Sequence, residues 1–420
     1  MSEPKVLIIG CGIAGPVLAV LLKRKGYSPV VFEKVRQLGD AGASLMLMPN
    51  GMKVLNLVGV ADEVYSGASP LDTYQDFKGD GTKLGMSDLP KSYRRKYGQC
   101  AVGVRRTRLN LMMKDLLLRS GIEVHEGWGL KTIEEVSDSV LASFTNGQTM
   151  RGSFLIGCDG IKAATRAVLL DKHQAPQPPP TYTGLTQISG LSPMPKAFTE
   201  SSMRNWYGEG VHVIAYPLSA EQISWAVTVP ETEEQSESWG LCSPEEMQQV
   251  KQDLSSRLDE FDSNVVEMVQ SAERILTFGL FDRETLAAPD WYSRRIVLCG
   301  DAAHPTSPHL GQGANQALED CYHLSDAFPD LKSNESGSSI PGDLEENFSR
   351  YAEKRQPRTA TLVRGARAVG EKRVVTGGKE ACERRDQAVV AEWQDTEAIA
   401  LKFDGLCREP FNALAATAAS

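Results

Sequence analysis

The sequence lacks three features that would place it in a specialised class: clustered positive charge, closely spaced cysteine pairs and a long uninterrupted apolar run. It has 420 residues and a net charge of −9, with a pI near 5.4. Nucleic acids and anionic membrane surfaces are bound by clustered Lys and Arg. The densest basic cluster, KSYRRK at 91–96, is predicted to be a solvated loop. The composition therefore argues against a nucleic-acid or membrane-surface partner.

Cysteine spacing excludes a second class, because zinc sites need ligands at short, regular intervals. At least four of the eight cysteines lie in apolar or motif contexts, which favours reduced, buried thiols and a cytoplasmic location. No metal site is predicted. The eight cysteines are Cys11, Cys100, Cys158, Cys242, Cys299, Cys321, Cys382 and Cys407.

The most apolar stretch, 6–22, is broken by three glycines and a proline, and its basic residues follow it. It therefore predicts neither a signal peptide nor a membrane span. The chain is 41% hydrophobic and 24% charged, close to globular averages, and its length ordinarily corresponds to two domains. We therefore expect a folded, multidomain protein.

The stretch 300–320 (GDAAHPTSPHLGQGANQALED) carries the clearest sign of a binding site. It follows an apolar run, 295–299, that predicts a short buried strand, so Asp301 would lie at the carboxyl end of that strand, where open α/β sheets bind ligands. Gly311 and Gly313 would let the backbone approach a bulky ligand, and a helix is predicted after Ala314. A strand-to-helix turn without a ligand is the alternative at this point.

The amino terminus supplies a second element of the same kind. An apolar strand at 5–9 is followed by GCGIAG at 10–15, a helix at 14–25 and a strand ending at Glu33. This arrangement is typical of a dinucleotide-binding βαβ unit, whose glycines permit a tight turn beside pyrophosphate and whose acid binds ribose. The pattern predicts a site for an ADP moiety and leaves NAD and FAD both open. The alternative is an ordinary βαβ unit.

Further elements follow along the chain. A helix is predicted at 109–119 with Arg106 before it, where its guanidinium could reach a phosphate. Asn146-Gly147 predicts a hairpin. A buried strand is predicted to begin at 154 and to end in an acid, Asp159, whose side chain would cap a helix or contact a cofactor.

A β-rich region is predicted beyond the proline-rich segment 174–180. Its last strand is expected at 277–283. A loop is predicted at 333–341 and then a helix ending near Arg358, followed by helical patterning at 381–403 without identifiable chemistry. The region could form one wall of an apolar pocket, although strand aromatics are more often core. These aromatics are Tyr182, Trp206, Tyr207, Tyr216 and Trp225.

Three separated motifs agree: GCGIAG with Glu33, GCDG at 157–160, and GDAAHPTSPHLGQGAN at 300–315. Together they resemble the flavoprotein monooxygenases of the para-hydroxybenzoate hydroxylase type, which include salicylate hydroxylase, over roughly residues 4–360. The resemblance implies an α/β fold with a Rossmann-like FAD-binding domain, an inserted β-sheet substrate domain and C-terminal helices. The expected boundaries are 1–75, 99–175 and 285–330 for the FAD-binding domain, 76–98 and 176–284 for the substrate domain, and 340–420 for the helices.

The resemblance also implies which residues hold FAD. The ADP part would lie against the first motif, and the ribityl chain and flavin ring against the third. Reduced flavin is anionic, and a helix amino terminus favours negative charge. The implied residues are Gly10, Gly12, Ile13, Ala14, Gly15, Glu33, Lys34, Gly42, Ala43, Arg106, Asp159, Gly300, Asp301, Pro308, Gly311, Gln312, Gly313, Ala314 and Asn315.

The implied activity is NADH- or NADPH-dependent hydroxylation of a small aromatic or hydrophobic substrate with O2, through a flavin C4a-hydroperoxide. No second GxGxxG with strand context is present, which fits transient binding of the nicotinamide. Alternatives are epoxidation of an alkene or indole, a flavin dehydrogenase or reductase without oxygen insertion, and a non-catalytic flavin-binding protein. A monomer or homodimer is expected.

Fewer residues are candidates for contacts with the substrate than for contacts with FAD. Tyr216, in HVIAYPL, matches a tyrosine that holds phenolates in several similar hydroxylases, whereas the stretch 186–190 has no Arg to accompany it. His212 and His309 are candidates for polar contacts, with a structural role as the alternative for each. His304 is expected to serve the turn that contains it.

Overall fold

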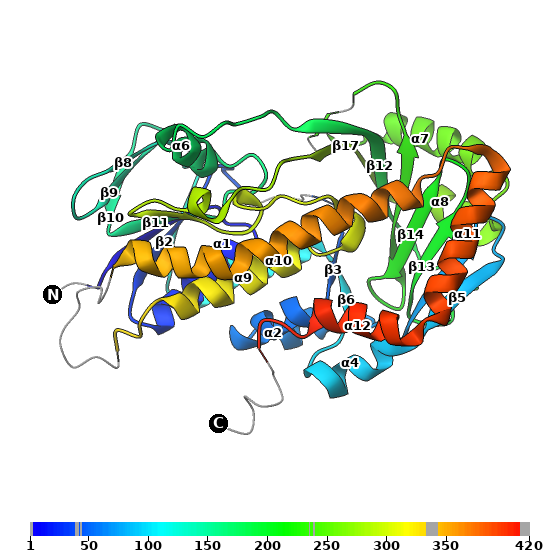
Figure 1. Ribbon diagram of the computed structural model, residues 1–420, viewed down its shortest axis with the longest axis horizontal. Helices are drawn as coiled ribbons and strands as arrows, with labels where there is room; N and C mark the ends of the chain where they lie inside the picture. The colour runs from blue at the N-terminus through cyan, green and yellow to red at the C-terminus, as the bar shows by residue number, and fades with distance from the viewer. Residues whose placement is uncertain are drawn as a thin grey trace.

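The computed structural model describes residues 3–37, 42, 44–234, 236–237, 240–332 and 343–411. Its first sheet is parallel, with strand order β18-β11-β1-β2-β7 (Figure 1). Except for the edge strand β7, whose sequence EVHE is polar, these strands are nearly continuous apolar runs because helices or a second sheet cover both faces. Their bounds are β1 Lys5–Ile9, β2 Ser28–Glu33, β7 Glu123–Glu126, β11 Phe154–Gly157 and β18 Ile296–Leu298.

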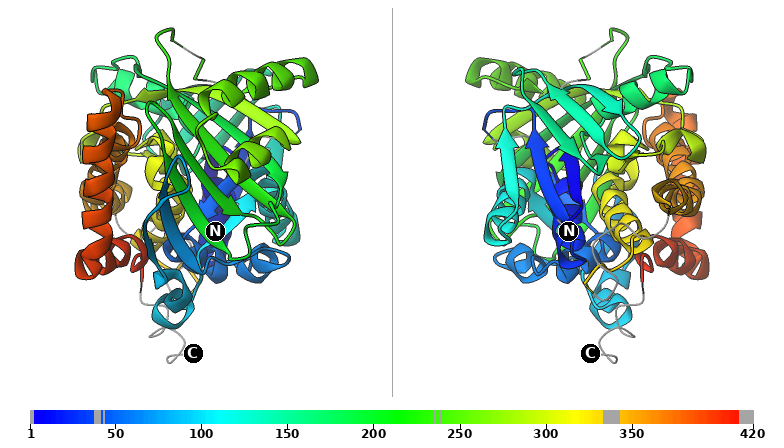
Figure 2. Two further views of the ribbon diagram at one scale, coloured as in Figure 1. Left: turned by 90° about the vertical axis from the view of Figure 1, so that its right-hand side faces the viewer. Right: turned by 90° about the vertical axis from the view of Figure 1, so that its left-hand side faces the viewer.

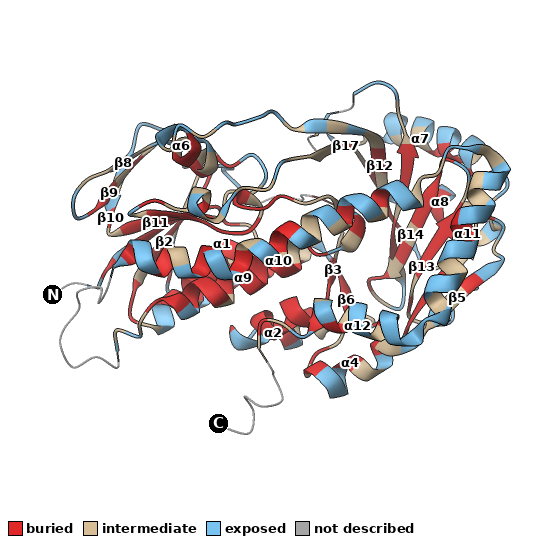
Figure 3. Ribbon diagram, in the orientation of Figure 1, coloured by how far each residue is buried: buried red, intermediate tan, exposed pale blue. Residues whose placement is uncertain are grey.

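Helices α1 (Ala14–Arg24), α5 (Arg106–Arg119) and α9 (Gly313–Ala327) cover the first sheet, and α1 packs against both of the others. Figure 3 shows that α9 is buried along most of its length. Helix α5 begins three residues earlier than predicted, at Arg106 itself. The guanidinium of Arg106 therefore starts from the first turn of a helix.

Smaller elements complete this half of the molecule. The hairpin predicted at Asn146-Gly147 is confirmed, since β9 and β10 pair antiparallel around it and Gly147 has a φ of +83°. These two strands form a small sheet with β8, and β3 pairs with β6 in a two-stranded ribbon. Their bounds are β3 Ser44–Leu47, β6 Val102–Arg105, β8 Leu130–Glu135, β9 Val140–Phe144 and β10 Thr149–Gly152, with helices α2 Pro49–Leu57, α3 Ala61–Tyr65 and α6 Ala164–Lys172.

An eight-stranded mixed sheet forms the other half, in the order β16-β17-β12-β15-β14-β13-β4-β5. Side chains on β14 alternate, so that Val213 and Ala215 pack in a core with α7 and α8 while Ile214 and Tyr216 face a cavity. The bounds are β4 Thr73–Lys78, β5 Lys83–Ser87, β12 Thr181–Pro193, β13 Ser202–Tyr207, β14 His212–Pro217, β15 Gln222–Pro230, β16 Gly240–Leu241, β17 Arg274–Asp282, α7 Pro244–Arg257 and α8 Ser263–Gln270.

Three helices close the chain: α10 Leu344–Arg373, α11 Gly378–Gln394 and α12 Thr396–Cys407. The prediction that the first of them ends near Arg358 is wrong, because α10 continues through Pro357 for four further turns. An interior proline costs about 3 kcal/mol. The buried side chains Arg355, Thr359 and Ala360 on either side of it show that tertiary packing offsets this cost.

The C-terminal helices cover the cavity side of the eight-stranded sheet. Figure 2 shows the sheet with α11 on one side and α7 and α8 on the other. Trp393 of α11 lies so close to β5 that a Cβ on Gly85 would fall 2.3 Å from its ring. The end of α12 is held by Lys53, whose ammonium donates hydrogen bonds to the carbonyl oxygens of Cys407 and Arg408 at 3.0 and 2.6 Å.

Further sequence-based expectations can be compared with the structure here. The basic cluster 91–96 is part of helix α4 (Leu89–Tyr97) and not a loop, with Lys96 paired to Asp404 at 2.9 Å. All eight cysteines lie in the described residues and are free, as expected for reduced thiols. No helix in the described part of the chain is long and apolar enough to span a bilayer. The loop predicted at 333–341 lies outside the described residues.

Candidate active site

The glycines after β1 have two different roles. Gly10 has a φ of +109°, and a Cβ there would lie 2.2 Å from the carbonyl oxygen of Cys158, while a Cβ on Gly15 would lie 2.0 Å from that of Gly10. The fold itself therefore requires both glycines. A Cβ on Gly12 would meet no atom within 4 Å, and Gly12 lines a large cavity together with Ile13 and Ala14. The free space in front of Gly12 is where a ligand backbone would approach.

Glu33 ends β2 close to this loop. Its carboxylate accepts hydrogen bonds from the backbone N–H groups of Cys11 and Val35, at 2.9 and 3.0 Å. These bonds fix the loop, and Glu33 and the exposed Lys34 do not line the large cavity. Contact between Glu33 and a ribose therefore stays a prediction.

Asp301 follows β18, as the sequence predicts, and lines the same cavity as Gly12 and Arg106. Burial raises the pKa of Asp301, and nearby His304 and Arg106 offset part of this rise. Burial likewise lowers the pKa of Arg106 from its ordinary value, with Asp301 acting against the shift. An acid and a guanidinium thus share one wall of the cavity, where they could bind the polar parts of a ligand.

The first turn of α9 lies beside Asp301. A Cβ on Gly313 would be 3.8 Å from the Asp301 carboxylate, and Gly311 has a φ of +61° that favours glycine. Pro308, Gly311, Gly313 and Ala314 line the cavity. Asn315 and Gln312 do not: the buried Asn315 amide donates to the carbonyl oxygen of Met46 at 3.0 Å and so ties α9 to β3.

Asp159 and the pair Gly42 and Ala43 were also predicted to contact the cofactor. The Asp159 carboxylate accepts a hydrogen bond from the N–H of Thr165 at 3.0 Å, so it caps α6 as expected for the more economical role of that side chain. It does not line the cavity, whereas its neighbours Cys158 and Gly160 do. Gly42 lines the cavity, and Ala43 lies outside the described residues.

A buried ion network behind Asp301 was missed by the sequence analysis. The Asp320 carboxylate accepts hydrogen bonds from the Gly300 N–H at 2.9 Å and from Arg355 Nε at 2.6 Å, and its Oδ2 lies 2.5 Å from His304 Nε2. Arg355 also donates to Glu319 at 2.7 Å. Asp320 therefore fixes the backbone at Gly300, one residue before Asp301. The available signal was a pair of acids, ED at 319–320, inside an apolar helix.

His304 stabilises the turn that contains it, as predicted, and it does so as a charged partner of Asp320. Burial alone would lower its pKa, but the Asp320 carboxylate more than offsets this, so the pKa of His304 is raised above its usual value. A raised folded-state pKa gives stability that is fully present below the unfolded pKa and is lost as the pH rises through the folded value.

We therefore expect the stability difference between wild type and His304→Gln to be largest at acidic pH and to shrink as the pH rises. For one proton the slope is at most about 1.4 kcal/mol per pH unit. Urea unfolding of both proteins across the pH range measures it. A difference that is the same at every pH would contradict protonation of His304.

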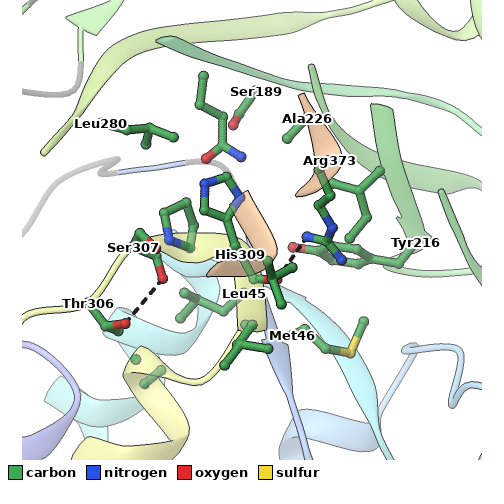
Figure 4. Close-up of a pocket in the computed structure, with 18 of the residues that line it drawn as sticks. Leu45, Met46, Ser189, Tyr216, Ala226, Leu280, Thr306, Ser307, His309 and Arg373 are labelled. Carbon is green, nitrogen blue, oxygen red and sulfur yellow. Dashed lines mark hydrogen bonds between the residues drawn. The ribbon is translucent and has the colours of Figure 1, made fainter. Parts of the chain in front are cut away.

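The cavity continues from this loop to the eight-stranded sheet and has a volume of about 1240 Å³. Tyr216 Oη lies 2.7 Å from Ser44 Oγ, which lies 2.5 Å from Ser224 Oγ. Burial raises the pKa of Tyr216, so its phenol stays protonated. Figure 4 shows Tyr216 on one wall, with Leu45 and Met46 of β3 below it. Sequence reasoning identified Tyr216 and missed the two serines.

The two candidate histidines lie in different environments. His212 does not line the cavity, and its Nε2 lies 3.1 Å from Asn205 Oδ1 among buried groups, which is a structural role. His309 lines the cavity, and burial and Arg373 lower its pKa to about 3. Neutral His309 can offer a hydrogen bond and no charge.

The C-terminal segment, for which the sequence suggested no chemistry, supplies part of the cavity wall. Its contribution comes from three helices that converge on the space between the two sheets. Helix patterning could show that these helices exist, and it could not show which sheet face they cover. The wall residues from this segment include Val369, Arg373, Ala388, Trp393, Ile399 and Phe403.

Comparison with known proteins identifies the family and its cofactor. The model of a family described as "FAD binding domain" matches residues 3–366. The chain belongs to this FAD-binding family. The match includes the loop of Gly12, Arg106, Asp301 and the first turn of α9, and it ends before the last turns of α10.

Relatives within the FAD-binding family are monooxygenases. The 3-amino-4-hydroxybenzoate 2-monooxygenase of Streptomyces cremeus is 32% identical over 400 residues, which cover 93% of this chain and 93% of that protein. The 3-hydroxybenzoate 6-hydroxylase of Polaromonas naphthalenivorans is 27% identical, with 88% of each chain covered. A salicylate hydroxylase structure in complex with substrate has a TM-score of 0.73 at 22% identity, covering 96% of this chain and 98% of that one.

This member of the FAD-binding family is therefore an FAD-dependent monooxygenase, an enzyme class whose reductant is typically NAD(P)H. The cavity suits the cofactor on two independent grounds. The space in front of Gly12 is free of protein atoms, and Ser307 lines the cavity with a hydroxyl oxygen that has no hydrogen-bond partner among the described residues.

Proposed function

We propose that the protein hydroxylates a small, electron-rich aromatic ring with O2 and NADH or NADPH, using bound FAD. The observation that carries this proposal is the single cavity that joins Gly12 and Asp301 to Tyr216, with a volume of about 1240 Å³. A pocket for one drug-sized ligand measures about 300–1,000 Å³. This cavity therefore has room for a substrate beside part of the dinucleotide. The names of the relatives, which specify an aminohydroxybenzoate and a hydroxybenzoate, support an aromatic substrate.

The cofactor would be held by the residues of the first wall. Gly12 would admit the pyrophosphate, Arg106 and Asp301 would bind polar atoms of the phosphate and ribityl parts, and the N–H groups at the start of α9 would favour negative charge on the ring. FAD, when bound, supplies the electron transfer and oxygen activation that amino-acid side chains do not provide.

The substrate would lie between the loop 308–310 and the eight-stranded sheet. The chain of hydroxyls Tyr216, Ser44 and Ser224 contains two hydrogen bonds and three protons. The third proton can go to the Gly190 carbonyl oxygen, 3.5 Å from Ser224 Oγ, or to a substrate oxygen. Apolar side chains such as Leu45 and Leu280 would exclude water from the reacting ring.

The test is a panel of hydroxylated and aminated aromatic compounds incubated with the FAD-loaded enzyme and either NADH or NADPH. We expect at least one compound to accelerate NAD(P)H oxidation and to gain one oxygen atom on its ring by mass spectrometry. An epoxide product from an alkene or indole would instead assign epoxidation. Accelerated NAD(P)H oxidation without any oxygenated product would assign a reductase and overturn the proposal.

The proposal has two further parts, the domain division and the cellular location. The division into an FAD-binding domain (1–75, 99–175, 285–330), a substrate domain (76–98, 176–284) and a helical segment (340–420) is supported by the separation of the two large sheets. A cytoplasmic location is supported by the eight free cysteines.

A further inference from the structure

Arg373 is one of the cations that line the cavity from the part of the chain beyond the matched family region. Arg373 is the last residue of α10 and is half-buried. One N–H of its guanidinium, on Nη1, donates to the carbonyl oxygen of His309 at 2.8 Å. Figure 4 places Arg373 at the cavity wall near Tyr216, on the side opposite Leu280. The guanidinium is thus anchored to the loop 308–310 and faces the proposed substrate space.

Three other cations that line the cavity from the C-terminal helices have their charges matched, and a fourth, Lys372, is exposed to solvent. Arg385 donates to Asp386 at 2.8 Å and to the carbonyl oxygen of Gly208 at 2.7 Å. Lys402 pairs with Glu392 at 2.5 Å, and Arg384 lies 3.9 Å from Glu380. For Arg373, the described residues contain no carboxylate oxygen within 4 Å of the guanidinium nitrogens.

Arg373 influences the buried acid Asp76, which already has partners. Its two carboxylate oxygens accept hydrogen bonds from Asn205 at 2.8 Å, Trp393 at 2.9 Å and Tyr207 at 3.1 Å. Burial also raises the pKa of Asp76, against the effect of Arg373. Asp76 is therefore a poor counter-ion for Arg373, and the charge of the guanidinium remains to be balanced from within the cavity.

Resting on the proposed function, we propose that Arg373 binds a carboxylate on the aromatic substrate and makes the enzyme select aromatic acids over neutral aromatics. Val369 and Ile214 contribute apolar surface to the same cavity, and an isolated charge next to such surface is stabilised by an opposite charge with hydrogen bonds. The planar fork of Arg matches a carboxylate in two parallel hydrogen bonds, which a neutral amide cannot reproduce. The bond to His309 fixes the position of this contact relative to the cofactor loop.

The first test needs no variant. Oxidised, FAD-loaded wild-type enzyme is titrated with 3-amino-4-hydroxybenzoate and with its carboxamide, and with 3-hydroxybenzoate and its carboxamide, while the flavin absorbance reports binding. At least one acid should bind at least about tenfold more tightly than its amide, since a hydrogen bond to a charged group contributes about 1.5–3 kcal/mol. If no acid binds more tightly than its amide, the assignment of Arg373 is overturned.

The second test uses Arg373→Gln, Arg373→Lys and, as the matched control, Lys372→Gln, which removes a positive charge from the neighbouring side chain, exposed but at the same cavity. We expect Arg373→Gln to weaken binding of the preferred acid about 10- to 100-fold and to leave amide binding within about twofold. Arg373→Lys should recover part of the preference, and Lys372→Gln should retain it. FAD content is measured in every variant.

The outcomes distinguish the proposed role of Arg373 from the proposed hydroxylase activity. Equal losses for acid and amide in Arg373→Gln, or an unchanged acid preference, would overturn the role of Arg373. An equal effect of Lys372→Gln would assign the preference for acids to general electrostatic attraction, and this result would also overturn the role of Arg373. The binding assay requires no turnover, so acid selection without any oxygenated product would uphold the role of Arg373 while the hydroxylase proposal fails.

Discussion

Replacing Gly12 by valine is expected to yield a folded protein that retains almost no FAD. The protein leaves open space at this position, since a Cβ on Gly12 meets no atom within 4 Å. The valine side chain would fill the approach of the pyrophosphate to the start of α1. Affinity for FAD should fall at least about 100-fold, or roughly 2.7 kcal/mol.

The measurement is the flavin-to-protein ratio after purification, followed by titration of the apoprotein with FAD. Gly10→Ala is the informative comparison, because its Cβ would fall 2.2 Å from the Cys158 carbonyl oxygen in a backbone of φ +109°. That variant should lose stability as well as FAD. The apoprotein of Gly12→Val should instead have nearly the same free energy of unfolding as the wild-type apoprotein. Gly12→Val with wild-type FAD affinity would disprove the role of Gly12.

Replacing Arg355 by methionine should destabilise the protein by about 3–5 kcal/mol, because it leaves two buried carboxylates without their shared cation. Arg355 is 1% exposed, and Glu319 and Asp320 are both 0% exposed. Both carboxylates keep other partners, Arg358 for Glu319 and His304 for Asp320, which places the expected loss within this range and not above it.

Chemical denaturation of the apoprotein measures this loss without a contribution from bound FAD. Arg367→Met, on the same helix but 64% exposed in its side chain, is the control and should change stability by less than about 0.5 kcal/mol. Arg355→Met should also lower FAD affinity, because Asp320 fixes the Gly300 backbone. A stable Arg355→Met variant would show that the network is not needed for the fold.

The sequence was sufficient to predict the elements that depend on local pattern. The strand before Asp301 and the strand and glycines around Gly12 follow from apolar runs interrupted by small residues, and the structure places both at one cavity. Asp159 was also predictable as a cap, because an acid a few residues before a helix satisfies its free N–H groups.

The features that escaped prediction depend on contacts between distant segments. Arg355 and Asp320 meet only because α10 packs along α9, and no periodicity in either helix identifies the pair. Pro357 suggested a helix end and so concealed the last turns of α10, which carry Arg373 to the cavity. Buried contacts on both sides of Pro357 override the local preference of proline, and only the folded chain shows them.

The most direct test of the account is turnover of the FAD-loaded enzyme under ¹⁸O2 with an aromatic compound that stimulates NAD(P)H oxidation. The account predicts a ring-hydroxylated product that carries one ¹⁸O atom for each NAD(P)H consumed in coupled turnover, and no label from H2¹⁸O in ordinary O2. A product whose new oxygen comes from water, or complete consumption of NAD(P)H without any labelled product across the aromatic panel, would contradict it.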